Sequence, residues 1–360
     1  MIDGLASFAT SLFHTRIVSG PGKALTLCSE LDRLGVGKVA VLCTPSGTNR
    51  YAGIVASLGT RCAAVFAQAA LHSPLPVAEA AARAVQESGA DATVCIGGGS
   101  TIGLGKFVAV TEGKPQVAIP TTLSGSELTP IHGFRSGGEK RTGVNPAAVP
   151  RLVIYDPRIS LSLPRQETAL SGMNCLAHCV EAFYVPDAGR LSDTLAAEGI
   201  RVLFEALPGC IERPGDEAAR ATALYGGLLG GLLVAMVGIG LHHKICHLLG
   251  GRFGLPHGAS NAIILSQVVA FNASAMPGAI RRMAVAMDAA DPAQACFMLA
   301  RRLGAPTSLR EMGVDRAALG AIAAELAAAS VPNPRHIERD GMETLLQRAW
   351  HGEEPTCGSI

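Results

Sequence analysis

Residues 93–101 read TVCIGGGST, and this stretch carries the clearest signal for how the chain folds. Thr93–Ile96 is a short apolar run typical of a buried strand, and the three glycines that follow favour a tight turn into a helix. Such a turn lets the backbone approach a pyrophosphate, while the N–H groups at the helix N-terminus bind its negative charge. The stretch lacks the G-x-G-x-x-G fingerprint, and a plain structural turn is the alternative. It predicts a phosphate-binding loop made by Gly97, Gly98, Gly99, Ser100 and Thr101.

A second loop of similar character follows the next predicted strand, Gln116–Ile119. Residues 120–127 read PTTLSGSE and place four hydroxyl side chains around a glycine. If both strands belong to one parallel sheet, their carboxyl ends meet at the edge where open α/β sheets bind ligands. The two loops together predict a nucleotide site whose second wall includes Thr121, Thr122 and Ser126.

The pattern along the rest of the chain divides it into two parts. Apolar runs with strand character occur at Lys38–Cys43, Arg61–Phe66 and Leu152–Tyr155, with a helical pattern at Val77–Gln86 and a hairpin tip at Gly137-Gly138. Strands that alternate with helices indicate a parallel sheet covered on both faces. After Asp156-Pro157 the segments have helical spacing to the end. We therefore predict an α/β domain over residues 1–156 and an all-α domain over 157–360.

Composition excludes several classes of protein. Hydrophobic residues make up 48% of the chain, charged residues 16%, and the net charge is +1, which gives no support for nucleic-acid binding. The ten cysteines are scattered without a CxxC pair, and no signal peptide is expected, so we predict a cytoplasmic protein with reduced thiols. Ala221–Leu241 is uncharged and as long as a membrane span, but six glycines interrupt it. We predict a core helix there and no membrane association.

Histidines cluster in the second part of the chain. His242, His243, His247 and His257 lie within sixteen residues, and His243 and His247 are one helical turn apart. Asn174 and His178 form another pair at the same spacing. Convergent imidazoles are the pattern that holds a divalent metal ion or transfers protons. A set of separately hydrogen-bonded core histidines is the alternative interpretation.

In these motifs the chain resembles the iron-containing alcohol dehydrogenase family over nearly its whole length. The carriers are CIGGGSTIGLGK with Lys106, PTTLSGSE, GMNCLAHCVEA and GLHHKICHLLGGRFGLPHG. The resemblance implies a Rossmann-like, dehydroquinate synthase-like domain that binds NADH or NADPH, followed by the helical domain. Gly103 and the LHHKICH segment are most similar to the maleylacetate reductase branch. That branch reduces a carbon–carbon double bond of maleylacetate, giving 3-oxoadipate, in the catabolism of aromatic compounds.

The resemblance also implies roles for residues at matching positions. Metal-binding members use one aspartate and three histidines, which here correspond to Asn174, His178, His243 and His257. An amide is a neutral and weak ligand, so we expect a vestigial site without metal. Many members carry an aspartate after the first strand, where this chain has Thr44, so NADPH should be tolerated beside NADH. A third departure is the segment Ala259-Ser260-Asn261 after Pro256-His257-Gly258, and it leaves the exact substrate open.

A reaction of this type needs an acid and partners for the substrate's charges. Hydride addition to an enone places negative charge on the carbonyl oxygen, which imidazole N–H groups and Lys244 could hold. We expect His243 to be the main proton donor, with His178 and His257 completing the cluster, His247 near the nicotinamide, and Asn174 in the site. A small dicarboxylate substrate needs cationic or N–H partners. The candidates are, in falling order, Lys244, His242, Arg252 and His132.

Three other functions stay open on the sequence. The nearest is a metal-dependent alcohol or hydroxyacid dehydrogenase of the same family, followed by a lyase related to dehydroquinate synthase. From a different class, the chain could bind a metal or nucleotide without catalysis. A homodimer is expected, with the β-rich segment of residues 13–22 in the interface.

Overall fold

The structure is a computed structural model that describes residues 14–71, 73–137 and 139–359. Its contacts divide the chain into two compact units. The sheet unit contains the described residues up to Leu163 together with Gly215–Ala235, and the helical unit contains Pro164–Pro214 and the described residues from Met236 onward. A parallel sheet in the first unit and helices in the second confirm the predicted fold class. The single boundary near residue 156 stays a prediction.

The sheet unit is built on six parallel strands in the order β1-β8-β5-β4-β2-β3. The strands are β1 (Arg16–Ser19), β2 (Val39–Leu42), β3 (Cys62–Phe66), β4 (Ala92–Gly97), β5 (Gln116–Pro120) and β8 (Leu152–Tyr155). The last five are those that the apolar runs predict. The strand β1 lies inside the predicted β-rich segment and forms one edge of the sheet. Phe13, which begins that segment, lies outside the described residues.

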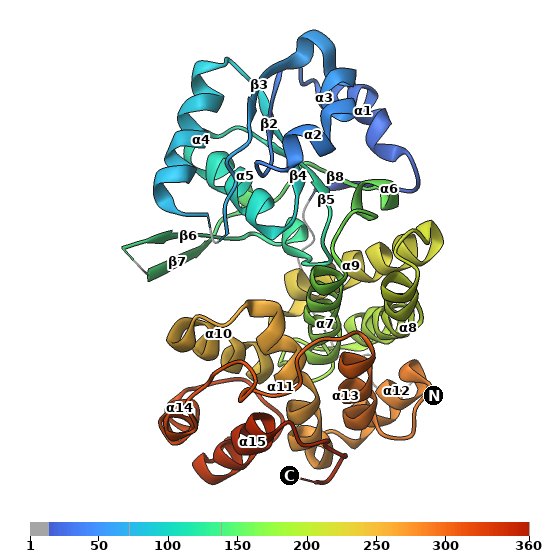
Figure 1. Cartoon of the computed structure of the whole chain (residues 1–360), viewed down its shortest axis with the longest axis vertical. Helices are drawn as coiled ribbons and strands as arrows, with labels where there is room; N and C mark the ends of the chain where they lie inside the picture. The colour runs from blue at the N-terminus through green and yellow to red at the C-terminus, as the bar shows by residue number, and fades with distance from the viewer. Residues whose placement is uncertain (1–13, 72, 138, 360) are drawn as a thin grey trace. The chain divides into compact units, whose positions relative to one another are not determined.

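Successive side chains of each central strand point into two different cores. Val39 and Val41 pack with Leu27 and Leu31 of one helix layer, whereas Leu42 packs on the opposite face. One face is covered by α1 (Leu27–Leu34), α2 (Gly47–Arg50) and α3 (Ala52–Leu58), and the other by α4 (Leu75–Glu87) and α5 (Gly99–Glu112) (Figure 1). Burying each aliphatic side chain contributes roughly 1.5–3 kcal/mol. Burial on both faces explains why these strands read as continuous apolar runs.

A hairpin extends the sheet unit beyond its main sheet. The strands β6 (Ile131–Ser136) and β7 (Glu139–Val144) pair antiparallel, with Ile131 opposite Val144. The pairing confirms the predicted hairpin, and Gly137 has the positive φ of 58° that a tight turn requires. Gly138 lies outside the described residues. A short helix, α6 (Pro157–Ser160), follows β8 and is capped by Asp156, whose side chain accepts from the Arg158 N–H.

The helix α9 (Glu217–Val237) joins the sheet unit although it lies far along the chain. It is long and apolar enough to cross a membrane by length and composition alone, and half of its apolar window is buried. A side chain on Gly231 would lie 2.7 Å from the carbonyl oxygen of Gly125, so this helix packs backbone to backbone against the PTTLSGSE loop. The packing supports the predicted core helix. The helix ends before Gly238, which has a φ of 78°.

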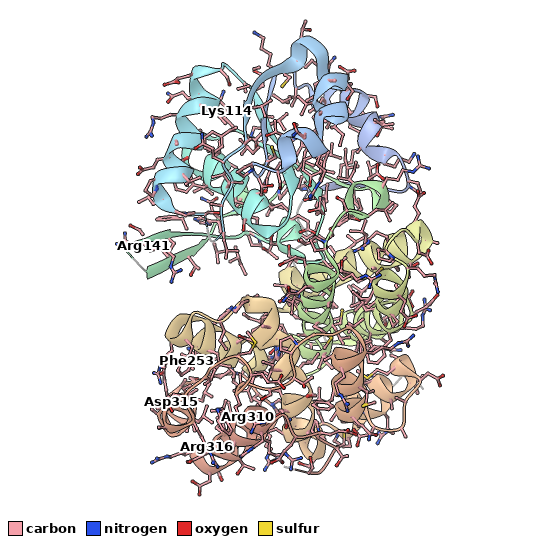
Figure 2. All side chains as sticks on the ribbon, viewed as in Figure 1. Lys114, Arg141, Phe253, Arg310, Asp315 and Arg316 are labelled. Atoms are coloured by element: carbon pink, nitrogen blue, oxygen red, sulfur yellow. The ribbon has the colours of Figure 1, made fainter. Side chains whose placement is uncertain are left out.

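The helical unit contains the remaining helices. They are α7 (Arg165–Glu181), α8 (Arg190–Glu212), α10 (Leu241–Phe253), α11 (His257–Asn272), α12 (Pro277–Met287), α13 (Pro292–Arg302), α14 (Leu319–Ala328) and α15 (Arg339–His351). The helix α11 is buried along most of its length and forms the centre of the unit. Near the C-terminus, Arg310 and Arg316 (Figure 2) place their guanidinium groups over the ring of Trp350, 5.5 and 5.4 Å from its centre. These contacts help to fasten α15 to the preceding loop.

Candidate active site

The two glycine- and hydroxyl-rich loops meet at one edge of the sheet, as predicted. The strands β4 and β5 are neighbours, with Gly97 opposite Pro120, and the Thr121 N–H donates to the Gly97 carbonyl at 3.0 Å. The helix α5 begins at Gly99, directly after the first loop. Its first N–H groups therefore point out of the carboxyl edge of the sheet, where anions bind.

Close neighbours leave no room for a side chain at two glycines of the first loop. A Cβ on Gly97 would lie 2.5 Å from the Thr101 hydroxyl oxygen, and a Cβ on Gly98 would lie 2.8 Å from the Thr122 side chain. Four buried hydroxyl oxygens in the two loops have no hydrogen-bond partner among the described residues: those of Thr101, Thr122, Ser124 and Ser126. Buried hydroxyls are nearly always partnered, so this group indicates a polar ligand at the loops. Ser100 is half-buried at the start of α5, next to them.

Lys106 lies deeper in α5 and makes its contacts within the protein. Its Nζ donates to the carbonyls of Thr129 and Ile131 at 2.7 Å each and to the Thr129 hydroxyl at 3.1 Å. Burial lowers the pKa of Lys106 to about 7, although the neighbouring Glu127 opposes this change. The three donors of the ammonium group are thus directed at the start of β6. Its role in coenzyme binding stays a prediction.

Thr44 lies just after β2, at the carboxyl edge of the same sheet. It is half-buried, and its hydroxyl lies 3.2 Å from that of Ser46. Neither side chain carries a negative charge. An additional phosphate on a ribose would therefore meet no charge repulsion from these two side chains.

The four histidine rings named by the sequence lie together in the helical unit. His178 comes from α7, His243 and His247 from α10, and His257 from the first turn of α11. The His178 and His243 rings stack with their centres 4.7 Å apart, and the centres of His247 and His257 are 5.7 Å apart. His243 lies 5.8 Å from His257 and 6.2 Å from His247, measured between ring centres. Three helices therefore bring the rings into one group.

Three polar atoms of this group are buried without a hydrogen-bond partner among the described residues. They are Oδ1 of Asn174, Nδ1 of His178 and Nε2 of His243. Burial lowers the pKa of His178 well below its ordinary value, and the neighbouring His243 adds to the effect. Burial likewise lowers the pKa of His243. The two rings are consequently neutral at neutral pH, and their ring nitrogens can accept from, or donate to, a bound ligand.

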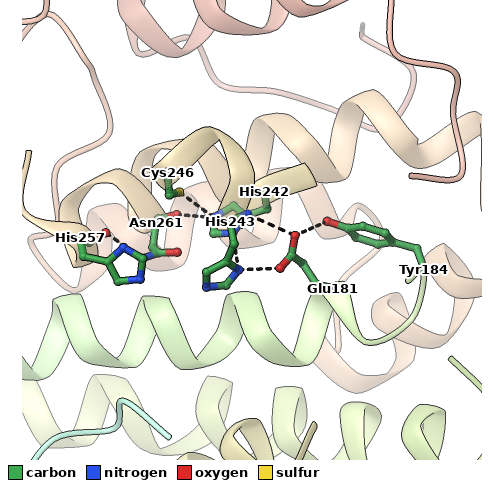
Figure 3. A network of polar contacts seen from close by, with 7 residues as sticks. All are labelled: Glu181, Tyr184, His242, His243, Cys246, His257 and Asn261. Carbon is green, nitrogen blue, oxygen red and sulfur yellow. Dashed lines mark hydrogen bonds and ion pairs between the residues drawn. The ribbon is translucent and has the colours of Figure 1, made fainter. Parts of the chain in front are cut away.

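Glu181 completes the cluster and was missed by the sequence analysis. It is fully buried at the end of α7, and its Oε2 lies 2.5 Å from Nδ1 of His243 (Figure 3). Its Oε1 accepts from the Tyr184 hydroxyl at 3.0 Å and from the His243 backbone N–H at 3.3 Å. Burial and this carboxylate raise the pKa of Tyr184. The spacing of Asn174, His178 and Glu181, at i, i+4 and i+7, puts all three on one face of a helix and was a usable signal.

His242 lies behind His243 rather than beside it in the open part of the cluster. It is fully buried, its Nε2 lies 3.2 Å from the Asn261 carbonyl oxygen, and its Nδ1 lies 3.3 Å from Nδ1 of His243. Burial lowers the pKa of His242 to about 3. A substrate carboxylate would have to displace one of these contacts to reach the ring, which differs from the role predicted for it.

The other predicted partners of substrate carboxylates are spread more widely. Lys244 is half-buried next to His243, whereas Arg252 is exposed and donates to Glu325 at 2.7 Å. His132 lies on β6 in the sheet unit, with its ring against Gly143 of the opposite strand. Of these three residues, Lys244 therefore lies nearest in the chain to the histidine cluster. The role of each in substrate binding stays a prediction.

Glu181, His242 and His243 form a trio whose potential ligand atoms lie within 4.8 Å of one another. These short separations arise from contacts that already join the three side chains. A metal ion between them would have to replace those contacts. The unpartnered atoms of Asn174, His178 and His243 are better suited to meet a ligand, because each has unused capacity.

Comparisons with known proteins agree with this arrangement. A family model described as iron-containing alcohol dehydrogenase matches residues 14–157, and one for the C-terminal part of the same family matches residues 168–350. The maleylacetate reductase of Burkholderia cepacia is 41% identical over 345 residues, which cover 95% of this chain and 97% of that protein. That of Rhizobium sp. (strain MTP-10005) is 41% identical over 348 residues, covering 97% and 99%. The solved structure of maleylacetate reductase from Agrobacterium tumefaciens matches with a TM-score of 0.94 and 39% identity, covering 98% of this chain and 100% of that one.

Proposed function

The chain belongs to the iron-containing alcohol dehydrogenase family and is an oxidoreductase, and we propose that it reduces the carbon–carbon double bond of maleylacetate with NADH or NADPH. The product is 3-oxoadipate, and the reaction is a step in the breakdown of aromatic compounds. The observation that carries the proposal is the histidine cluster with Asn174 at its fourth position. The names of the relatives at 41% identity support the same substrate.

The chemistry divides between the two units. Reduced nicotinamide supplies the hydride when it is bound. The loops of the sheet unit supply free N–H groups and hydroxyls for its phosphates. Hydride reaches the carbon β to the ketone, so the chain must hold negative charge on the carbonyl oxygen and deliver a proton to the α-carbon. Ring N–H groups of the cluster and the ammonium of Lys244 are suited to these tasks.

The family implies a metal ion, and the donor atoms of the cluster fit one in number and kind. Asn174, His178 and His243 each have a buried atom without a hydrogen-bond partner in the described part of the chain, and the His257 ring lies beside that of His243. These four side chains would hold the ion, which would polarise a carbonyl or acidify an alcohol. None of the four carries a negative charge, so the affinity should be low. An enone is already activated by conjugation, and we propose that the reduction proceeds without a metal.

One alternative has support in the same geometry. Three buried acceptor-capable atoms without hydrogen-bond partners among the described residues would also suit a metal-dependent alcohol or hydroxyacid dehydrogenase. That function would require the ion for activity and would favour simple aldehydes over an enone. The two proposals differ in what chelation does to the rate.

We also propose a cytoplasmic homodimer with no membrane or nucleic-acid partner. The scattered cysteines support a cytoplasmic location, and the near-neutral net charge supports the absence of a nucleic-acid partner. The strand β1 ends the main sheet, and Ile17 on it is 36% exposed. An edge strand offers unpaired backbone groups to a second copy. Size-exclusion chromatography with light scattering tests the oligomeric state.

The experiment that tests the function measures maleylacetate-dependent NADH oxidation before and after exhaustive chelation, with metal analysis of the purified protein. We expect turnover to persist after chelation. Activity that is lost and then restored by Fe²⁺ or Zn²⁺ would overturn the metal-free proposal. Rapid turnover of simple aldehydes, with no turnover of maleylacetate, would overturn the proposed substrate and favour the alternative dehydrogenase. Asn174→Asp should tighten metal binding at least tenfold without raising the rate with maleylacetate.

A further inference from the structure

We propose that Glu181 is a positioning residue that holds His243 in a single tautomer, with the proton on Nδ1 and the lone pair of Nε2 facing the site. The inference rests on the proposed reduction for its catalytic consequence but not for the tautomer itself. It is carried by a chain of hydrogen bonds that runs through the helical unit from Asn261 to Tyr184 (Figure 3).

The direction of this chain is set at one end by a backbone carbonyl. The Asn261 oxygen can only accept, so Nε2 of His242, 3.2 Å away, carries the proton, and the Cys246 sulfur, 3.7 Å from the same nitrogen, is then a weak second acceptor. Nδ1 of the neutral His242 ring is then an acceptor, and it faces Nδ1 of His243 at 3.3 Å. Two acceptors at this distance would repel each other. The carbonyl therefore favours a proton on Nδ1 of His243, and the carboxylate of Glu181 is the group that holds it there.

The same direction is set from the other end by Glu181. A carboxylate accepts and does not donate, and its Oε2 lies 2.5 Å from Nδ1 of His243. The other oxygen is engaged by the Tyr184 hydroxyl and by the His243 backbone N–H. A Cβ on Gly240 would lie 3.0 Å from the Tyr184 ring and 3.3 Å from Oε1 of Glu181, so the chain packs closely around this carboxylate. Glu181 has no exposed surface, and its carboxylate accepts from three donors. These contacts leave the carboxylate a single orientation.

The consequence concerns which ring can supply the proton. With Nδ1–H committed to Glu181, the neutral His243 ring presents an acceptor at Nε2, the atom without a partner among the described residues. It can accept from a substrate hydroxyl or hold a cation, but it cannot donate in this form. Reduction adds one hydride, from the reduced nicotinamide, and one proton. That proton must then come from another donor than His243, and His247 and His257 are the rings of the cluster that are exposed to solvent, which can replace it.

The direct test is ¹⁵N NMR of the full-length protein labelled at histidine, because the shift of a ring nitrogen reports whether it carries a proton. The His243 signals are assigned by their loss in His243→Gln. We expect a protonated Nδ1 and an unprotonated Nε2 for His243 in the native protein, and the reverse pattern for His242. A proton found on Nε2 of His243 would overturn the proposal, whether or not maleylacetate is turned over.

Substitution of the carboxylate gives the second test. In Glu181→Gln an amide N–H must face either the Nδ1–H or the backbone N–H of His243, so the preference for one tautomer is lost. We expect a mixed tautomer signal and a kcat 10- to 100-fold lower, with KM for NADH unchanged, because outer partners of reactive histidines have effects of this size. Unchanged kcat and tautomer in a folded Glu181→Gln protein would overturn the proposal.

Tyr184→Phe is the matched control for the variant. It removes a donor from the same carboxylate while keeping the contact with His243. We expect the Nδ1–H tautomer to persist and kcat to fall less than fivefold. A loss equal to that of Glu181→Gln would mean that the pocket tolerates no change of any kind, and would overturn the specific role of the carboxylate. Should Glu181→Gln fail to fold, the native spectrum still decides.

Discussion

Each unit of the protein buries a glutamate to which a tyrosine hydroxyl donates, yet the two glutamates have different neighbours. In the sheet unit, Tyr155 donates to Glu127 at 2.8 Å, and the nearby cation is Lys106, whose donors are all directed at the protein. In the helical unit, Tyr184 donates to Glu181, and the next group is His243, whose far nitrogen has no partner among the described residues.

The difference teaches how similar buried carboxylates serve different purposes. A lysine directs all its protons inward and fastens β6 to α5, so the cluster around Glu127 stabilises the sheet unit. An imidazole has two nitrogens on opposite sides, so a carboxylate that binds one of them orients the other toward a ligand. The comparison assigns stability to the first cluster and reactivity to the second, and substitutions can test that division.

The largest expected effect is on the histidine cluster. His257→Ala removes an exposed ring next to His243 and His247, so the fold should lose little. We expect kcat for maleylacetate to fall about a thousandfold, within the range that general acids contribute. Steady-state kinetics with NADH measures the loss, and thermal unfolding checks the fold. His336→Ala, an exposed histidine of the same unit outside the cluster, should stay within twofold of the native rate.

A smaller effect is expected on the lysine cluster. Lys106→Met leaves the carbonyls of Thr129 and Ile131 without their donor and Glu127 without its cation. We expect the free energy of unfolding to fall by about 3 kcal/mol, as for other broken buried pairs. Urea unfolding followed by circular dichroism measures it. A raised KM for NADH with unchanged stability would give Lys106 the predicted coenzyme role and break the comparison.

The double variant Lys106→Met with Glu127→Gln serves as the control for that measurement. It removes the uncompensated buried charge while keeping the shape of the side chain. We expect it to be at least 1 kcal/mol more stable than Lys106→Met alone. Equal stability of the two proteins would show that charge pairing does not hold this cluster together.

Much of this arrangement follows from local patterns in the sequence. The strands were predictable because burial on both faces makes each a continuous apolar run, and GGGS and PTTLSGSE marked the two loops at the carboxyl edge of the sheet. The histidine cluster was predictable in its members, because i, i+4 spacing places ligands on one helical face. The contacts that join different elements were not predictable, because no local pattern indicates that His242 turns toward Asn261 or that α9 packs against Gly125.

The partners of charged side chains were also beyond the sequence. Lys106 and Arg252 look alike in sequence as cations near a site, but one is buried under β6 and the other pairs with Glu325 on the surface. Which anion or carbonyl a long side chain reaches depends on tertiary packing rather than on sequence spacing. Glu181 was missed for a related reason: its spacing places it on the helical face of Asn174 and His178, but its contact with His243 forms only where α10 packs against α7.

The smallest expected effect tests whether coenzyme preference is set within the sheet unit alone. Thr44→Asp places a carboxylate after β2, where the 2′-phosphate of NADPH would meet like charge and the ribose hydroxyls of NADH would gain an acceptor. We expect KM for NADPH to rise about tenfold, equivalent to about 1.4 kcal/mol, with kcat unchanged for both coenzymes. The control is Thr60→Asp, which adds the same charge at an exposed position before β3. This position is at the amino ends of the parallel strands, whereas Thr44 is at their carboxyl ends. Equal KM changes for NADH and NADPH in Thr44→Asp would contradict a charge-based preference, because only one coenzyme carries the additional phosphate.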